Sequence, residues 1–121
     1  LAVLGLGREL RVDVIAVNAL WPRTTSATAA IENVLGGDAL MRMSRKPEIL
    51  GDAAHLVFRQ SASMFSGNFL IDDTFLHKVG GVNDFEPYKV EAGALLAPDF
   101  FVPAESRPPP GVTLAPASML K

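Results

Sequence analysis

The chain has 121 residues, of which 49% are apolar and 20% charged, a balance typical of a folded globular protein with at most one domain. Its formal charge of -2 gives no basic field that would attract nucleic acid or an anionic membrane surface. Cysteine is absent, which excludes disulfides, thiolate catalysis and cysteine-based zinc sites. No apolar run approaches the ~20 residues of a membrane span and no signal-peptide pattern is present, so we expect a cytoplasmic protein.

The first ten residues, LAVLGLGREL, contain Gly5-Leu6-Gly7, which could begin a dinucleotide-binding glycine loop. Such a loop follows a complete strand and needs a small third residue, but few residues precede it here and the third position holds Leu10. The spacing of Val3, Leu6 and Leu10 favours an amphipathic helix instead. Because this helical pattern begins at Leu1 without a cap, we expect the chain to be a piece of a longer protein.

An almost continuous apolar run with many β-branched residues, 12–20, follows this helix. The run predicts a strand buried on both faces, as in a parallel sheet, and Trp21-Pro22 ends it. After a polar stretch we expect a short helix that ends at Gly36-Gly37, and then a basic connection over 42–46.

A clearer helix is predicted to open at Pro47 and to have an apolar side made of Leu50, Ala53, Ala54 and Val57. Ser66-Gly67 then turns the chain into a second apolar strand, 68–71, which ends at Asp72-Asp73. A short helical segment is expected near 74–79.

Strand, helix and strand at this spacing predict a right-handed βαβ unit with two parallel strands, and therefore an α/β fold. Parallel sheets bind ligands beyond the carboxyl ends of their strands. The segment from Pro22 to Thr28 lies at such an end, so it is the first place to look for a binding site. From Pro103 onward the chain lacks a pattern and contains the run 107–111, Arg-Pro-Pro-Pro-Gly, so we expect residues 102–121 to form an extended, flexible, Pro-rich tail.

Three segments in order resemble the short-chain dehydrogenase/reductase family. "RVDVIAVNALWPRTT" resembles the strand that runs into the nicotinamide-facing loop, "SRKPEILGDAAHLVF" resembles the next helix, and "FSGNFLIDD" resembles the last strand of the sheet. The resemblance implies that residues 1–101 are the C-terminal part of a Rossmann-type, doubly wound parallel sheet in the order helix, strand, helix, strand.

The resemblance also implies a cofactor, NAD or NADP, and a catalytic Tyr-x-x-x-Lys that comes before the first helix of this chain. The only tyrosine here is Tyr88, and four residues later stands Ala92 instead of lysine. No Gly-x-x-x-Gly-x-Gly follows a strand. We therefore expect no catalytic residue within the chain, and we expect the chain alone to be inactive in hydride transfer.

What the resemblance leaves in this chain is the half of the cofactor site that holds the nicotinamide carboxamide. The residues expected to bind it are Pro22, Thr24, Thr25 and Thr28. Two departures from the family pattern matter, because Arg23 replaces a glycine and the threonine comes one place late; Ser26 is a further candidate hydroxyl. An alternative is that the loop only caps a helix, with Ser26 or Thr28 at the N-cap and Glu32 in the next turn.

Asp72 and Asp73 could be a general acid/base pair or a metal site. Neighbouring residues on a strand point to opposite faces, so capping of the following helix is favoured. Asp52 and His55 have a spacing that can bring two ligands together, but two ligands do not make a site, and we predict no metal.

A basic cluster in the connection could attract a phosphate or an acyl carboxylate, although a solvated connection is favoured; its members are Arg42, Arg45 and Lys46.

The leading hypothesis is the C-terminal part of an NAD(P)-dependent oxidoreductase for hydroxy or carbonyl groups, and the resemblance adds lipid-like or acyl substrates. The alternative is a short non-catalytic protein that serves as a scaffold or subunit-interaction module. A homo-oligomer is expected, and because the first strand would expose an edge, the isolated chain should be poorly soluble or oligomeric.

Overall fold

The computed structural model describes residues 2–35 and 37–120. Within them the regular elements are α1 Ala2–Glu9, β1 Ala19–Trp21, α2 Gly37–Arg42, α3 Glu48–Phe58, β2 Phe69–Ile71 and α4 Asp72–Lys78. Short helical turns complete the description: 3-10 turns over Leu10–Asp13, Glu86–Tyr88 and Ala117–Leu120, and a π-helical turn over Ile31–Leu35. None of the described helices is long and apolar enough to cross a bilayer.

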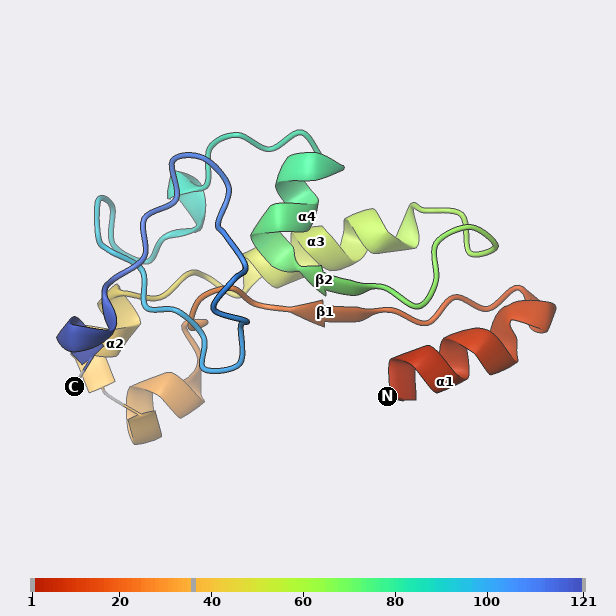
Figure 1. The fold of residues 1–121 in the computed structure, drawn as a ribbon. Helices are drawn as coiled ribbons and strands as arrows, with labels where there is room; N and C mark the ends of the chain where they lie inside the picture. The colour runs from red at the N-terminus through yellow and green to blue at the C-terminus, as the bar shows by residue number, and fades with distance from the viewer. Residues whose placement is uncertain (1, 36, 121) are drawn as a thin grey trace.

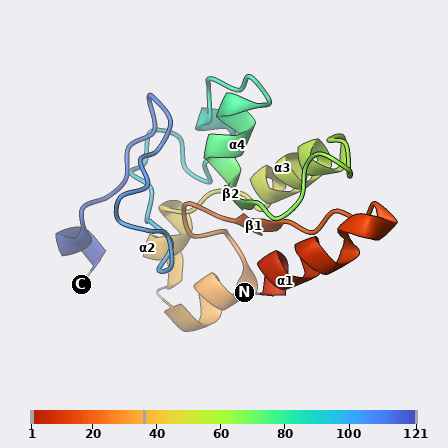
Figure 2. The same ribbon diagram turned by 45° about the vertical axis from the view of Figure 1, so that its right-hand side comes forward.

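The two strands form a parallel pair in which Leu20 lies opposite Leu70. Helices α3 and α4 lie on one side of this pair, and α1 lies on the other (Figures 1 and 2). The predicted α/β class with parallel strands separated by helices is confirmed. The larger doubly wound sheet remains an expectation, because the described residues form two paired strands.

The apolar core lies between α3 and α4 and consists of Ile49, Ala53, Leu76 and Phe85, against which Leu20 and Leu56 pack. Helix α3 opens directly after Pro47, as predicted, and Ile49 and Ala53 share a face because they are four residues apart. At the end of α4 the backbone approaches closely, since a Cβ on Gly80 would lie 2.7 Å from the carbonyl oxygen of Leu76. Only glycine fits there without a shift.

The first predicted strand is too long. Residues 10–13 continue α1 as a 3-10 turn, Val14 takes a left-handed conformation with φ of 57°, and pairing as a strand starts only at Ala19. The β-branched residues that suggested a strand here are mostly exposed, because the chain is turning rather than entering a sheet. The residues before Ala19 still lie beside the residues that lead into β2, since the Gly67 amide donates to the Val17 carbonyl at 2.7 Å.

The helix predicted for the first ten residues is confirmed as α1, so Gly5-Leu6-Gly7 lies inside a helix. Gly7 is buried against Ser66 and Gly67, and a Cβ there would lie 3.3 Å from the Ser66 hydroxyl. Glycine therefore serves close packing here. The apolar face of α1 is only partly covered, because Leu6 stays 45% exposed.

The short helix predicted to end at Gly36-Gly37 corresponds to the π-helical turn Ile31–Leu35, which ends directly before this pair. Gly37 has a φ of +59°, which favours glycine, and it also begins α2, while Gly36 lies outside the described residues. Helix α2 was not predicted, because its six residues are too few for a clear apolar period.

The Pro-rich segment lies against the body of the protein instead of extending away from it. Leu96 donates to the Thr113 carbonyl and accepts from the Ala115 amide, and Pro109 and Ala115 are buried. Figure 1 shows this segment in blue beside the loops that follow α4. The flexibility predicted for residues 102–121 stays a prediction.

Candidate functional site

A buried group of charged side chains lies where both strands end. Asp73 accepts from Arg23 Nε at 2.7 Å and from Arg45 Nη1 at 3.0 Å, and the three side chains are at most 1% exposed. Asp72 lies beside them, also buried. We call Arg23, Arg45, Asp72 and Asp73 the arginine–aspartate cluster.

Arg23 connects more segments than the other members of the cluster. Its Nη2 donates to the Thr74 hydroxyl at 2.7 Å and to the Ser106 hydroxyl at 3.2 Å, and its Nη1 donates to the Ser106 carbonyl at 3.1 Å. One planar guanidinium therefore holds β1, α4 and the Pro-rich segment together.

Asp72 does not cap α4, and neither does Asp73, so the capping prediction is wrong. Ile71 is the N-cap residue, has no side-chain cap, and both aspartates lie in the first helical turn. The Oδ1 atom of Asp72 accepts from the Arg23 amide at 3.1 Å and from the Asp73 amide at 2.7 Å. Burial is the main cause that raises the pKa of Asp72 to about 6.

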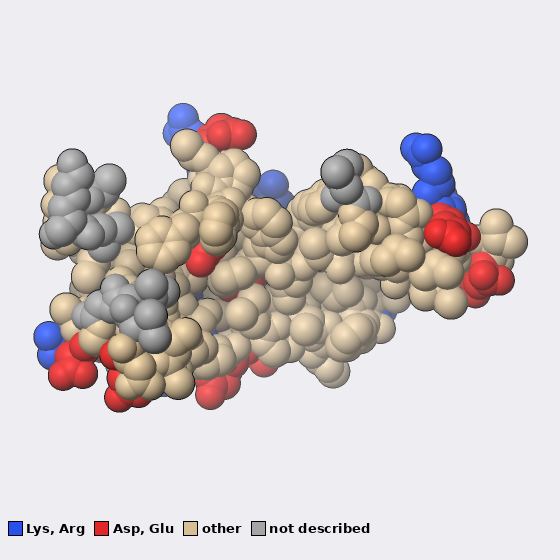
Figure 3. Space-filling view, turned by 90° about the horizontal axis from the view of Figure 1, so that it is seen from below, with Lys and Arg blue, Asp and Glu red and all other residues tan. Residues whose placement is uncertain are grey.

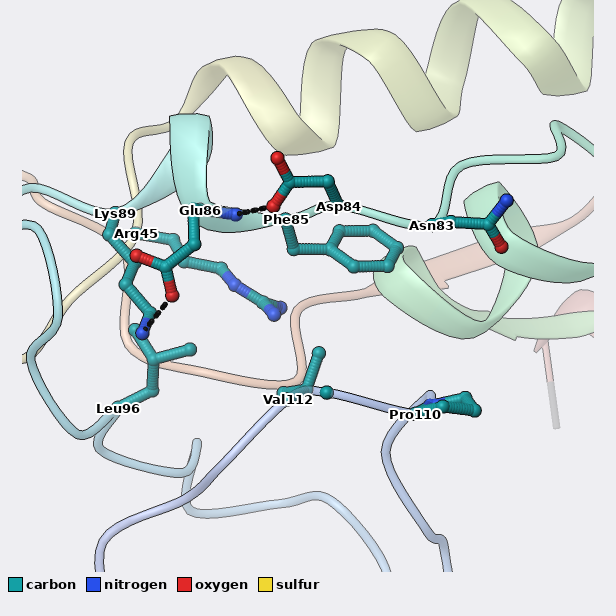
Figure 4. Close-up of a pocket in the computed structure, with 10 residues that line it drawn as sticks. Arg45, Asn83, Asp84, Phe85, Glu86, Lys89, Leu96, Pro110 and Val112 are labelled. Atoms are coloured by element: carbon teal, nitrogen blue, oxygen red, sulfur yellow. Dashed lines mark hydrogen bonds and ion pairs between the residues drawn. The ribbon is translucent and has the colours of Figure 1, made fainter.

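Arg45 was predicted to lie in a solvated connection, and this is also wrong, although Arg42 and Lys46 are exposed. Its guanidinium carbon lies 5.4 Å from the centre of the Phe85 ring. Figure 4 shows the guanidinium pointing between Phe85 and Val112, in the lining of a pocket that also includes the Glu86–Lys89 ion pair. A cation–π contact and an ion pair keep Arg45 inside.

The 22–28 loop is held through alternate residues. The Arg23 carbonyl accepts from the Asp99 amide at 2.8 Å and the Thr25 amide donates to the Ala97 carbonyl at 2.9 Å. Arg45 exchanges two backbone bonds with the next part of the loop, accepting from Ala27 at 2.8 Å and donating to the Thr25 carbonyl at 3.0 Å.

Residues between these tied positions have the opposite orientation. Thr24 and Ser26 are the paired residues of these bridges, opposite Pro98 and Arg45. Because the backbone is extended here, their own N–H and C=O groups point away from the segments that hold the loop. Thr24 is 1% exposed, so its groups are covered, whereas the half-buried Ser26 offers one donor and one acceptor at the carboxyl end of β1.

Two of the predicted hydroxyls serve internal bonds. Thr24 Oγ1 donates to the Thr25 carbonyl at 3.2 Å, and Thr25 Oγ1 lies 2.7 Å from the Ser44 hydroxyl. Since Ser44 Oγ donates to the Leu40 carbonyl at 2.7 Å, Thr25 is the donor to Ser44. Both threonines are buried, whereas Thr28 is exposed.

Pro22 is half-buried at the start of the loop. The Thr28 carbonyl accepts from the Glu32 amide at 3.1 Å, so the helical turns begin just after the loop. No side-chain cap from Ser26 or Thr28 is found among the described residues. The binding roles predicted for Pro22 and the three threonines remain predictions.

The described residues contain no group of three or more His, Asp or Glu side chains that could hold a metal ion. Asp52, the candidate partner of His55, instead accepts a 2.6 Å hydrogen bond from the Tyr88 hydroxyl. Burial and this carboxylate raise the pKa of Tyr88 to about 12, so the hydroxyl keeps its proton at neutral pH.

No family model matches the chain. Hydroxysteroid dehydrogenase-like protein 2 of Danio rerio is 48% identical over 102 residues, which are 84% of this chain and 24% of that protein. The Homo sapiens protein of the same name is 44% identical over 100 residues, 83% of this chain and 23% of its own length. The chain is homologous to part of these proteins. It spans about a quarter of the length of the curated relatives it matches.

A solved short-chain dehydrogenase from Mycobacterium thermoresistibile is 45% identical and superposes with a TM-score of 0.75, covering 93% of this chain and 39% of its own. The resemblance seen in the sequence is therefore confirmed as homology to short-chain dehydrogenases.

Sequence reasoning missed the arginine–aspartate cluster. A signal was available, because parallel strands bring their carboxyl ends together and Arg23 and Asp73 each follow such an end.

Proposed function

We propose that this chain is the C-terminal part of an NAD(P)-dependent oxidoreductase that acts on hydroxy or carbonyl groups, and that its 22–28 loop holds the nicotinamide. Homology to short-chain dehydrogenases supports the reaction class. The observation that carries the site is the alternation in the loop, which directs the backbone groups of the half-buried Ser26 away from their own support at the end of a parallel strand.

The chemistry of this loop fits a nicotinamide carboxamide, which has one carbonyl acceptor and an amide group with two donor hydrogens. The N–H and C=O groups of Ser26 offer the complementary pair, and the exposed Thr28 adds a hydroxyl. Nicotinamide supplies the hydride chemistry when bound. This chain's residues bind the carboxamide and thereby fix which face of the ring meets the substrate.

Uncovered apolar surface supports the view that the chain packs against further structure. Trp21 and Phe69, in the two strands, are 42% and 54% exposed, and Val12 before them is 89% exposed. Figure 3 shows a face whose broad middle is formed mostly by uncharged residues. Parallel sheets in proteins are normally covered on both faces. In this proposal that further structure contributes the catalytic Tyr-x-x-x-Lys, the glycine loop and most of the substrate pocket.

The proposal is tested on the native protein, captured from its source cells with an antibody against residues 107–116. Intact-mass and peptide-sequencing analysis should find a species much heavier than 12.9 kDa with a Tyr-x-x-x-Lys peptide before the sequence of α1. The same preparation should oxidise NADH or NADPH in the presence of a carbonyl substrate. A chain that starts near α1 and leaves both cofactors unoxidised would contradict the proposal.

The same exposed apolar surface favours a second candidate, a non-catalytic interaction module. In that case the native species is the short chain bound to another protein, and the loop's backbone groups have no cofactor to hold. Lipid-like substrates, implied by the family resemblance, are a proposal for the oxidoreductase alone, and a homo-oligomer is a proposal for both candidates.

A further inference from the structure

We propose that Arg23 is a positioning residue for the 22–28 loop and that the Pro-rich segment, through Ser106, forms part of the support that holds this loop against the nicotinamide. This inference rests on the proposed function for its ligand. Its mechanical part, the support of the loop by a remote segment, stands on the hydrogen bonds of the described residues.

Arg23 is placed to set the start of the loop. It directly follows Pro22, its amide donates to Asp72, and its carbonyl accepts from Asp99. Its side chain is fully buried, with Nε on Asp73 at 2.7 Å. Main chain and side chain of one residue are thus fixed by groups that follow β2 and by groups from the segment after residue 96.

Ser106 supplies contacts that no local residue replaces. It lies 83 positions from Arg23 in the sequence, yet it uses both its carbonyl and its hydroxyl on the guanidinium. The neighbouring Phe100 and Phe101 are 70% and 76% exposed, so the segment around Ser106 gains little from apolar burial. Two hydrogen bonds to a buried cation therefore anchor this part of the segment.

The shape of the guanidinium matters as much as its charge. Nε, Nη1 and Nη2 reach Asp73, Ser106 and Thr74 in one plane. A lysine at this position keeps the charge and its attraction to Asp73 but cannot reproduce three fixed directions. Arg23→Lys therefore loosens the loop and retains most of the ion pair.

Hydrogen–deuterium exchange with residue resolution tests the mechanical part on the native assembly. The amides of Thr25 and Ala27 are tied, so Arg23→Lys should speed their exchange about tenfold while Ala53 in α3 stays within about twofold. Ser106→Ala, which leaves the ion pairs intact, should speed the same amides about threefold. The matched controls are Arg107→Lys and Ser118→Ala, at exposed positions of the same segment, and they should change neither.

Cofactor binding then separates positioning from general stability. Arg23→Lys should weaken NADH binding about fivefold and leave the binding of ADP-ribose, which lacks nicotinamide, unchanged. Equal exchange at Thr25 and Ala27 in both variants and their controls would overturn the inference, as would faster exchange spread equally to Ala53. If the unmutated protein binds NADH no better than ADP-ribose, the proposed function fails, while faster loop exchange would still support the role of Arg23.

Discussion

The apolar core and the arginine–aspartate cluster hold neighbouring parts of the molecule together by different interactions, apolar burial in the core and buried ion pairs in the cluster. The core joins α3 to α4 through residues such as Ile49 and Leu76, and its strength comes from removing apolar area from water. The cluster joins the ends of β1 and β2 through charges that are costly to bury, and among the described residues Arg45 Nε, Arg45 Nη2 and Asp72 Oδ2 are buried without a hydrogen-bond partner, which leaves the existing partners no substitute. The core thus tolerates exchange of one apolar residue for another, while the cluster depends on each partner.

Asp73→Asn should have the largest effect, because it leaves two buried arginines facing a neutral amide. We expect a loss of about 3–5 kcal/mol in the free energy of unfolding, or a failure to fold, since removing one partner strands the others. Urea unfolding measures the loss. The control is Asp38→Asn, an exposed aspartate of α2, which should change stability by less than about 0.5 kcal/mol. A similarly small effect at Asp73 would show that the cluster does not depend on its partners.

Ile49→Ala should have the next largest effect on stability, and it tests the apolar core against the charged cluster. Ile49 is 1% exposed, so the truncation leaves a cavity and should cost about 2–5 kcal/mol. This loss should be the same in low and high salt. Phe58→Ala, at a side chain that is 84% exposed on the same helix, should cost less than about 0.5 kcal/mol. A loss that depended strongly on salt would break the distinction between the two regions.

The core could largely be predicted from the sequence because its signal is local. The period of three to four residues after Pro47 located α3, and the apolar run before Asp72 located β2. The predicted side of α3 was shifted by one residue, since Ile49 rather than Leu50 is fully buried. Where the signal was ambiguous, as in the β-branched run before Ala19, the prediction of a strand was too long.

Asp72→Asn should change how the free energy of unfolding depends on pH. Because burial raises the pKa of Asp72 from 3.8 to about 6 in the folded chain, the stability that its protonated form contributes is present below pH 4 and is lost as the pH rises through 6. The asparagine variant lacks this loss. Its stability relative to the unmutated chain should therefore rise by about 1–3 kcal/mol between pH 4 and pH 7.

Chemical unfolding of both chains at several pH values measures this difference. Asp73, Arg23 and Arg45 lie beside this position in both chains, so the difference between the chains isolates Asp72. Asp38→Asn serves again as the control and should give no trend. A difference between the two chains that is flat across this range would mean that Asp72 is not stabilised in its protonated form.

Val14→Gly should have the smallest effect and should be stabilising. Val14 has a φ of 57°, a left-handed conformation that is strained for a β-branched residue, and it ends the 3-10 turn after α1. Relief of this strain exceeds the extra flexibility of glycine, so a gain of about 0.5–1 kcal/mol is expected. Val12→Gly, outside the left-handed region, should be destabilising in the same thermal unfolding experiment. A loss of stability in both variants would contradict the claim that Val14 is strained.

The candidate site could be placed from the sequence, but its geometry could not. The ends of the two strands identified the 22–28 loop, and the family resemblance gave it a ligand. The partners of Arg23 lie 50 and 83 residues away, and no local pattern encodes them. For the same reason the hydroxyls of Thr24 and Thr25 were assigned to the cofactor, although the structure places them in internal hydrogen bonds with Thr25 and Ser44.

One measurement tests the central claim most directly: residue-resolved hydrogen–deuterium exchange of the native protein with NADH and with ADP-ribose. The account predicts that NADH slows exchange at the amide of Ser26, which points away from the loop's support, and that ADP-ribose does not. The amides of Thr25 and Ala27 should be slow throughout. Equal exchange at Ser26 with both ligands would contradict the claim that this loop holds the nicotinamide.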